Sequence, residues 1–184
     1  MIIIVGESGA GKTTLQKELV NIFDTRFTKL VTYTTRPPRD MEQDGVDYHF
    51  VTEDEFEELK RNGFFLETAT YRGWHYGSPK CDDYSAIAIL TPAGLRAAIR
   101  AGVPVVSFYL KVDRRSRLIK LLKRGDDIEE AYRRSISDVG QFDGIEGEVD
   151  FVIQNEGYQE DIYTLVDIVL KDLAKARYTH NDNN

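Results

Sequence analysis

The sequence predicts an α/β fold in which helices flank a central parallel sheet. Two patterns support this fold: the chain opens on an apolar, β-branched run at 1–5, and strand-length apolar segments alternate with segments of helical periodicity along most of its length. Such alternation is typical of a parallel sheet. A third observation is that the alternation stops between 36 and 79, which indicates an inserted, partly antiparallel subdomain.

Length and composition fit one domain of 184 residues with a packed core, since 41% of the residues are hydrophobic. The net charge of −7 argues against general binding of nucleic acid or of an anionic membrane. No apolar run reaches transmembrane length, and no signal peptide is visible. Because Cys81 is the single cysteine, no intrachain disulfide can form, as expected for a cytoplasmic chain that acts as a monomer or homodimer.

The first half of the chain contains strand, helix and loop patterns in an order that brackets the insertion. The run at 1–5 predicts a strand buried on both faces, and a Gly-rich turn separates it from a helix. The apolar stripe of that helix is Leu15, Leu19, Val20 and Phe23. The later segments are predicted as a strand at 30–35, a loop at 36–45, a helix at 53–60, and strands at 64–71 and 74–76 around a turn at 72–73.

The second half returns to strict alternation. Thr91 and Pro92 are typical of a helix start, with threonine as N-cap and proline in the first turn. Gly125 should end a basic helix and separate it from a polar one. The predicted segments are strands at 86–90, 103–110 and 151–154, helices from 91 to 100, 114 to 123, 127 to 139 and 162 to 173, and a polar tail from about 178 to 184.

A phosphate-binding loop is the strongest local signal. Residues 6–13 read Gly-Glu-Ser-Gly-Ala-Gly-Lys-Thr and match G-x-x-x-x-G-K-[ST] between a buried strand and an amphipathic helix. Glycines let backbone N–H groups surround phosphate oxygens, lysine neutralises their charge, and the Thr13 hydroxyl can ligate Mg²⁺. The expected donor-binding residues are Gly6, Glu7, Ser8, Gly9, Ala10, Gly11, Lys12, Thr13 and Thr14.

A second anion site is indicated by Arg36 and Arg39, which flank two prolines. Arginine offers paired planar donors to a dianionic phosphate. Proline lowers the entropy lost when such a loop becomes ordered. Any phosphorylated small molecule would satisfy this pair of arginines, so the pair alone does not identify the acceptor.

In the stretch that contains these arginines, the sequence resembles the guanylate kinase family. The matching elements, in order, are the phosphate-binding loop, T-T-R-P-P-R at 34–39, D-G-V-D-Y-H-F at 44–50, F-L-E at 65–67 and Y-G-S at 76–78. Looser matches follow at Arg124-Gly125, Arg134 and 153–155, so the resemblance extends to about residue 173. It implies a P-loop kinase core, an inserted mixed α/β subdomain that binds a nucleoside monophosphate, and a helical lid.

The resemblance also implies roles for individual residues. A carboxylate such as Glu67 suits guanine, because it can accept hydrogen bonds from N1–H and from the exocyclic amine. The implied GMP-binding residues are Thr32, Arg36, Arg39, Tyr48, Glu67, Tyr76, Ser78 and Thr91. The implied catalytic residues are Lys12, Arg36, Arg124 and Arg134, with Asn155 on the adenine side and Mg²⁺ bound with ATP.

The sequence departs from the family pattern at three places. The family has two aspartates after its middle strand, and Ile89 and Thr91 stand in their place. Glu7 replaces a frequent proline, and the lid spacing is one residue short, so Arg133 is an alternative to Arg134. Either Thr13, phosphates and water suffice for Mg²⁺, or the enzyme is slow, or its acceptor preference differs.

The predicted organisation is one domain with three parts. The core spans about 1–35, 80–123 and 141–173, the GMP-binding subdomain about 36–79, and the lid about 124–140. The resemblance implies transfer of the γ-phosphoryl group of ATP to GMP or dGMP. A guanylate-kinase-like binding module and a kinase for another phosphorylated acceptor are the alternatives.

Overall fold

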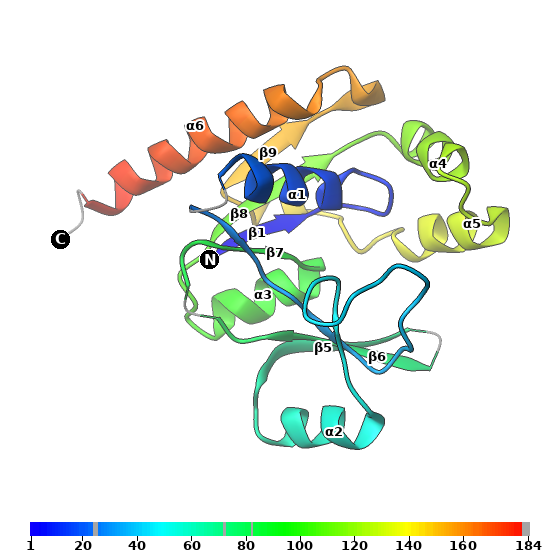
Figure 1. Ribbon diagram of the computed structural model, residues 1–184. Helices are drawn as coiled ribbons and strands as arrows, with labels where there is room; N and C mark the ends of the chain where they lie inside the picture. The colour runs from blue at the N-terminus through cyan, green and yellow to red at the C-terminus, as the bar shows by residue number, and fades with distance from the viewer. Residues whose placement is uncertain (24–25, 72, 82, 182–184) are drawn as a thin grey trace.

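The computed structural model describes residues 1–23, 26–71, 73–81 and 83–181. Within these ranges the strands form two sheets, and Figure 1 shows the central sheet in the upper half of the view and the second sheet in the lower half. The central sheet has the order β2-β7-β1-β8-β9, with every pair parallel. Its strands are β1 (Ile2–Val5), β2 (Thr28–Lys29), β7 (Ala86–Ile89), β8 (Val106–Lys111) and β9 (Phe151–Gln154). The α/β fold with a central parallel sheet is therefore confirmed.

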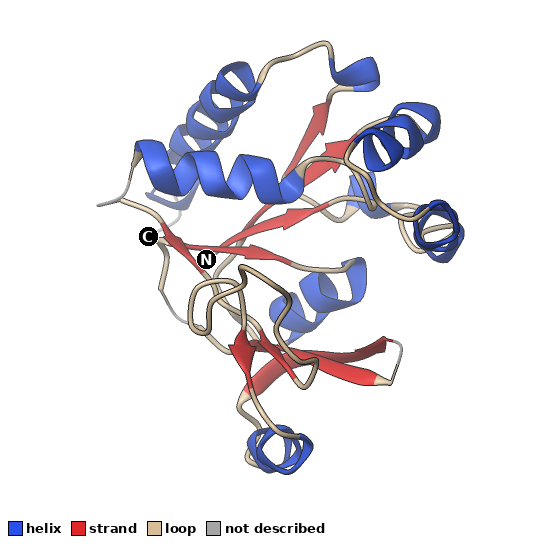
Figure 2. Cartoon of the chain, turned by 45° about the vertical axis from the view of Figure 1, so that its right-hand side comes forward, coloured by secondary structure: helices blue, strands red, loops and turns tan. Residues whose placement is uncertain are grey.

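Helices cover both faces of the central sheet, as Figure 2 shows. On one face Ile2 and Ile4 pack with residues of α1 (Lys12–Ile22) and α6 (Ile162–Asn181). On the other face Ile3 and Val5 pack with Leu95 and Ala98 of α3 (Pro92–Arg100). All four residues of β1 are buried, which explains why this strand reads as a continuous apolar run.

Side-chain caps determine where most of the other helices begin. Thr91 accepts from the Gly94 N–H at the start of α3, and Asp113 accepts from the Ser116 N–H at the start of α4 (Arg114–Lys123). Asp127 caps α5 (Ile128–Ser137) in the same way. Between these two helices Gly125 has φ +88°, a conformation that favours glycine and ends α4. The predicted helix starts at 91, 114 and 127 therefore agree with the structure.

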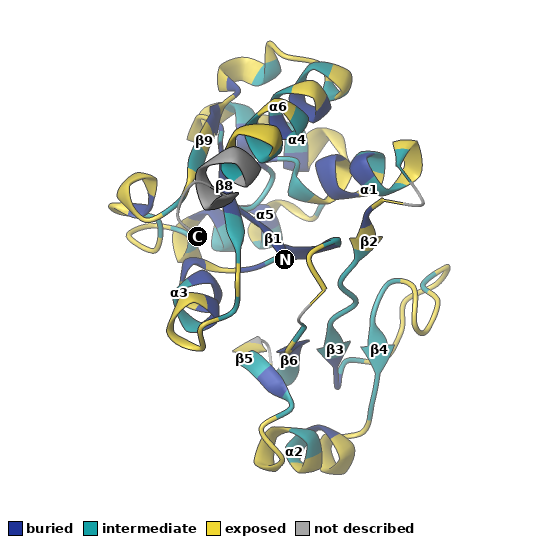
Figure 3. Cartoon of the chain, turned by 90° about the vertical axis from the view of Figure 1, so that its left-hand side faces the viewer, coloured by how far each residue is buried: buried dark blue, intermediate teal, exposed yellow. Residues whose placement is uncertain are grey.

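The second sheet lies beyond α3 and has the order β4-β3-β6-β5. Its strands are β3 (Tyr33–Thr34), β4 (His49–Phe50), β5 (Phe65–Tyr71) and β6 (Trp74–Pro79). Helix α2 (Glu53–Arg61) covers it, starts at a Thr52 capping box, and buries only Phe56, so most of its surface is exposed in Figure 3. The pairing of β5 with β6 is antiparallel, as predicted for the inserted segment.

Several predicted boundaries differ from the structure. The strand predicted at 30–35 is shorter, and β3 pairs with β6 in the second sheet instead of extending the central sheet. The strand predicted from 103 begins at Val106, because the Val103 N–H donates to the Ala98 carbonyl and closes the turn after α3. The tail predicted from 178 is helical to Asn181, and 182–184 lie outside the described residues, as does Arg72 of the predicted turn.

The remaining short elements are the 3-10 turns η1 (Ile145–Gly147) and η2 (Glu156–Tyr158), on either side of β9. Across the part of the chain that the structure describes, no helix combines the length and the apolar character that crossing a membrane requires. Because the central strands are parallel, their carboxyl ends meet at one edge of the sheet. In open sheets of this class ligands bind at that edge.

Candidate functional site

A cleft of about 1150 Å³ lies between the carboxyl ends of β1 and β7, the second sheet, and the α4–α5 turn with α5. Most of the residues that the sequence singles out lie on its walls. Those residues are Gly6, Ser8, Lys12, Thr13, Thr32, Arg36, Arg39, Tyr48, Glu67, Tyr76, Ser78, Thr91, Arg124 and Arg134. The cleft thus combines the phosphate-binding loop, the arginine pair and Glu67 in one space.

The loop between β1 and α1 has the geometry that its glycines predict. Gly9 and Gly11 adopt φ values of +84° and +104°, which non-glycine residues rarely adopt. A Cβ on Gly6 would lie 2.7 Å from the Leu110 carbonyl oxygen, so glycine is also required for packing against β8. Gly11 caps α1 without a side-chain hydrogen bond, which leaves the first N–H groups of the helix directed at an anion site.

Lys12 turns back onto this loop. Its Nζ donates to the carbonyl oxygens of Gly6 at 2.6 Å and Glu7 at 3.0 Å. Burial lowers the pKa of Lys12 to about 8, and the nearby Asp138 and Glu7 carboxylates partly offset this effect. The ammonium group is therefore placed beside the anion site with a pKa close to neutral pH.

At the far end of the cleft, the carboxylate of Glu42 accepts hydrogen bonds from Arg36 and Arg39, which belong to the same loop as Glu42. Both Nη2 contacts from Arg36 to the Glu42 carboxylate are 3.0 Å, and the Arg39 backbone N–H donates to Glu42 at 2.8 Å. The Arg36 guanidinium also lies 5.4 Å from the Tyr48 ring centre, and Tyr48 contacts Tyr76 edge-on. The Glu42 carboxylate thus occupies an anion position beside Arg36, and the rings of Tyr48 and Tyr76 lie next to it.

Glu67 lies between the second sheet and the N-terminus of α3. The Thr91 hydroxyl donates to its Oε2 at 3.1 Å and accepts from the Gly94 N–H at 3.1 Å, while the Ser78 hydroxyl lies 3.5 Å from Oε1. Burial raises the pKa of Glu67, and these hydroxyl donors oppose that rise. A Cβ on Gly94 would lie 2.2 Å from Oε2, so only glycine leaves room for the carboxylate here.

The lid arginines are paired with acidic residues of their own segment. Arg124 donates to Asp126 through Nε at 2.7 Å, and Arg134 donates to Glu130 at 2.8 Å and lies 3.7 Å from Asp126. Arg124 holds the pKa of Asp126 below its usual range. Arg133 pairs with Glu130 but lines a separate surface pocket, so Arg134 is the one of the two that faces the cleft.

Four further predicted donor residues border a second cavity of about 450 Å³. Ala10, Gly11, Thr14 and Asn155 line it. Both polar atoms of the Asn155 amide bond the backbone of Glu160, so this side chain shapes the loop after β9. Its predicted place on the adenine side remains a prediction.

Ile89 lies at the end of β7 and lines the cleft, so an apolar side chain stands there in place of the aspartate of the family pattern. Among the residues that the structure describes, no group of three or more His, Cys, Asp or Glu side chains could hold a metal ion by itself. A metal in this cleft would therefore need ligands from a bound molecule.

The basic helix predicted at 114–123 indicates a solvated face that includes Arg117, and for this residue the interpretation is wrong. The structure buries Arg117, with 6% of its surface exposed, behind the phosphate-binding loop. Its position four residues before the buried Leu121, on the same face of α4, is the sequence signal that indicates burial. No sequence motif marks the acidic residues that pair with the arginines and with the phosphate-binding loop, and only the fold reveals them. These residues are Glu42, Asp126, Glu130 and Asp138.

Replacing Thr91 by alanine should raise the pKa of Glu67 further, because the carboxylate then loses a hydrogen-bond donor that favours its charged form. Thr91→Ser, which keeps the hydroxyl, should restore the wild-type value. The carboxyl carbon of Glu67, followed by NMR during a pH titration, measures this shift. Equal pKa values in all three proteins would show that the Thr91 contact does not stabilise the charged carboxylate.

Comparisons with known proteins agree on one family. The family model described as guanylate kinase matches residues 1–172. A guanylate kinase of Nitrosococcus oceani is 34% identical over 172 residues, which cover 86% of this chain and 82% of that protein. A guanylate kinase of Streptococcus pyogenes is 32% identical over 166 residues, which cover 85% of this chain and 78% of that protein.

Solved structures show the same fold at lower identity. The crystal structure of guanylate kinase from Anaplasma phagocytophilum aligns with a TM-score of 0.68 and 23% identity, over 96% of this chain and 85% of that one. A gluconokinase from Sinorhizobium meliloti aligns with a TM-score of 0.54 and 13% identity, over 100% of this chain and 97% of that one. Together with the loop and cleft geometry, the family model and the relatives show that this chain belongs to the guanylate kinase family.

Proposed function

We propose that this chain transfers the γ-phosphoryl group of ATP to GMP or dGMP, giving ADP and (d)GDP. The observation that carries the proposal is the single cleft with a phosphate-binding loop at one end and an arginine pair with a buried carboxylate at the other. A donor triphosphate and an acceptor monophosphate bound at these ends would meet in the middle. Family membership supports the same reaction.

The donor end would hold the triphosphate through backbone N–H groups of the loop, the N-terminus of α1 and Lys12. Lys12 would exchange its contacts with the Gly6 and Glu7 carbonyls for phosphate oxygens. The nucleoside of the donor would lie in the second cavity, which Thr14 and Asn155 border.

The acceptor end would hold the phosphate of GMP with Arg36, Arg39, Tyr48 and Tyr76. The Glu42 carboxylate, which now accepts from Arg36, would be displaced or shared. Glu67 would accept from N1–H and the exocyclic amine of guanine, with Thr32, Ser78 and Thr91 around it. Adenine presents an acceptor at N1, so it would leave the carboxylate unpaired and bind less well.

The donor set suits Mg²⁺ bound together with ATP. The Thr13 hydroxyl is a hard oxygen ligand, and it lines the cleft beside Lys12. When bound, the ion would neutralise negative charge on the transferring phosphates. Thr13 would hold it together with phosphate oxygens and water, since Ile89 offers no ligand and the described residues contain no independent metal cluster.

Catalysis in such a cleft consists of positioning and charge stabilisation. Arg124 and Arg134 line the lid side, and each would exchange acidic partners for phosphate oxygens as the segment closes. Closure would also exclude water, which would otherwise compete with GMP as acceptor. We therefore propose the division into core, a GMP-binding part at about 36–79 and a lid at about 124–140.

An ATP-coupled assay against GMP, dGMP, AMP, CMP and UMP tests the proposal. Turnover is expected with GMP or dGMP, and Lys12→Ala should lower kcat by about 100-fold or more, because charge on the phosphates loses its nearest cation.

Glu67→Gln should lower kcat/KM for GMP by about 100-fold, because its amide places a donor against guanine. Glu58→Gln, on the exposed face of α2, is the matched control. A wild-type protein that neither binds nor phosphorylates GMP and dGMP contradicts the proposal.

ADP affinity should fall as pH rises through about 8. The pKa of Lys12 in the free protein is about 8, so the ammonium is charged below that pH and loses its proton above it. Phosphate groups, with a second pKa of about 6, keep their charge over the same range. Calorimetric titration of ADP between pH 7.5 and 9.5 measures the effect, and Lys12→Arg, which does not titrate there, should flatten the profile. If the ADP affinity of the wild type did not change with pH, the proposed contact between the Lys12 ammonium and the phosphates would be contradicted.

Gly94→Ala should weaken GMP binding by about tenfold or more, because a Cβ at this position would lie 2.2 Å from the Glu67 carboxylate and displace it. Binding of an ATP analogue should not change. Gly147→Ala is the control, since a Cβ there meets nothing within 4 Å. Fluorescence or calorimetric titration with GMP measures both variants, and unchanged GMP affinity in Gly94→Ala would argue against guanine recognition by Glu67.

A further inference from the structure

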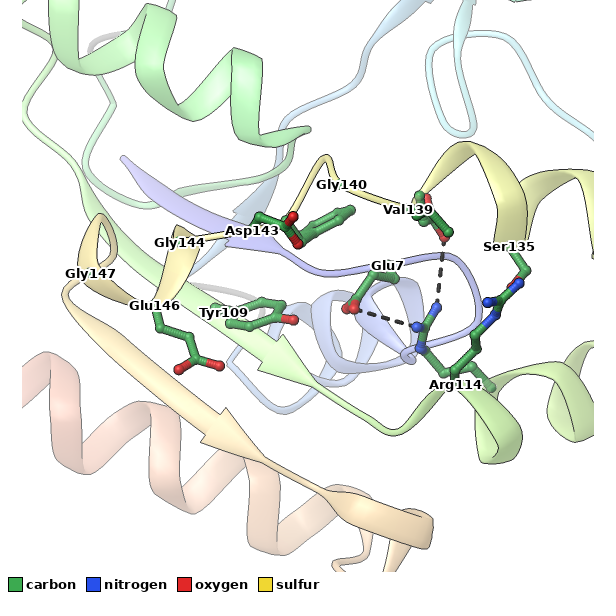
Figure 4. Close-up of a pocket in the computed structure, with 13 residues that line it drawn as sticks. Glu7, Tyr109, Arg114, Ser135, Val139, Gly140, Asp143, Gly144, Glu146 and Gly147 are labelled. Carbon is green, nitrogen blue, oxygen red and sulfur yellow. Dashed lines mark hydrogen bonds and ion pairs between the residues drawn. The ribbon is translucent and has the colours of Figure 1, made fainter.

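A cavity of about 510 Å³ lies beside the phosphate-binding loop, between Glu7, α4 and the segment after α5, and Figure 4 shows its interior. Glu7 extends from the loop into this space, with its carboxylate directed toward the hydroxyl of Tyr109. One oxygen of Glu7 is buried without a hydrogen-bond partner. Burial and the Glu7 carboxylate raise the pKa of Tyr109. The loop position at which this chain departs from its family therefore belongs to a buried polar cluster.

Arg117 of α4 is the centre of that cluster. Its Nε donates to the Val112 carbonyl at 3.0 Å, its Nη1 donates to the Ser8 carbonyl at 3.3 Å, and its Nη2 lies 3.4 Å from the Glu7 carboxylate. None of these partners belongs to α5 or to the segment after it. These contacts with the core hold the guanidinium beside the loop.

Asp138 reaches the same place from the lid. It is the C-cap of α5, and its Oδ2 accepts a hydrogen bond from the Ser8 backbone N–H at 2.8 Å. The same oxygen lies 3.7 Å from Nη1 of Arg117. Backbone N–H groups of a loop of this type bind phosphate oxygens. The carboxylate of Asp138 therefore makes a contact of the kind that a donor phosphate would make.

Asp138 is one of four charged groups that act on one another beside Ser8, and their charges sum to zero. Lys12 and Arg117 are the cations, and Glu7 and Asp138 are the anions that act on them. Glu7 is part of the loop and stays with Arg117, whereas Asp138 arrives on a separate segment. If Asp138 leaves, one positive charge remains uncompensated beside a free N–H group. That combination attracts one anion.

We propose that Asp138 is an internal anion that holds the place of a donor phosphate oxygen, and that the incoming donor displaces it. Arg117, held by Glu7, stays behind the loop and supplies positive charge to the bound phosphates as a positioning residue. The proposal extends the donor half of the proposed function to residues outside the motif, and it does not depend on which acceptor is used.

Displacement would also link donor binding to the lid. Asp138 follows Arg134 by four residues at the end of α5, and the Asp138 N–H donates to the Arg134 carbonyl at 3.1 Å. Movement of the cap would therefore be transmitted to the helix that carries this lid arginine. In this way the arrival of the triphosphate would release one end of α5 from the core.

Asp138→Asn tests the proposal, because it keeps the shape of the side chain and removes its charge. We expect affinity for a non-hydrolysable ATP analogue with Mg²⁺ to rise by about tenfold, the scale of one charge-assisted hydrogen bond. Adenosine, which has no phosphate, should bind equally to variant and wild type. In the wild type, the analogue should shift the NMR amide resonance of Ser8, as its hydrogen-bond partner is exchanged.

The matched control is Asp143→Asn, which removes an exposed carboxylate from the wall of the same cavity. It should leave affinity for the analogue within about twofold of wild type. Thermal melting of both variants verifies folding, and Arg117→Lys, which keeps the charge, should lose less affinity than Arg117→Met. Equal or weaker binding by Asp138→Asn than by Asp143→Asn overturns the proposal, and so does a wild type that does not bind the analogue.

The GMP assay separates this inference from the proposed function. A gain in analogue affinity without phosphorylation of GMP or dGMP would support the role of Asp138 and contradict the acceptor assignment. Phosphorylation of GMP without any gain in Asp138→Asn would support the reaction and overturn the displaced-anion role.

Discussion

The close approach of the loop after β1 to the neighbouring strand β8 is the constraint on which the site depends. A Cβ on Gly6 would lie 2.7 Å from the Leu110 carbonyl oxygen, so glycine there lets the chain turn directly at the sheet edge. The turn delivers Lys12 and the N-terminus of α1 to the carboxyl ends of the strands. Because β7 pairs with β1 on the other side, the same edge also receives Ile89 and the cap of α3. Donor and acceptor ends thus share one cleft.

Several of the groups proposed to bind phosphate are already paired with carboxylates in the free protein. Desolvating an unpaired arginine or lysine is costly, and a nearby carboxylate offsets that cost. The pairs come from different parts of the chain: Arg36 with Glu42, Arg124 with Asp126, Arg134 with Glu130, and the Ser8 N–H with Asp138. Ligand binding in such a site is an exchange of anions. The net gain from each contact is therefore smaller than the strength of the contact suggests, and selectivity arises from geometry.

Local signals in the sequence predicted the elements that local chemistry determines. The phosphate-binding loop, the cap at Thr91 and the break at Gly125 all depend on neighbouring residues, and all three follow from the sequence. Contacts between distant segments could not be predicted this way. Arg117 meets Glu7 across 110 positions, and Ser8 meets Asp138 across 130. The two-residue strand β3 joins the second sheet through β6, a partner about 40 positions away, so its pattern alone could not assign it.

The hydroxyl of Thr91 performs two tasks with one oxygen, since it caps α3 and donates to Glu67. An aspartate could cap the helix equally well, but it would place a second negative charge against a carboxylate that is already partly desolvated. The uncharged hydroxyl thus couples the start of a core helix to the charge on a side chain of the second sheet, through a single oxygen atom.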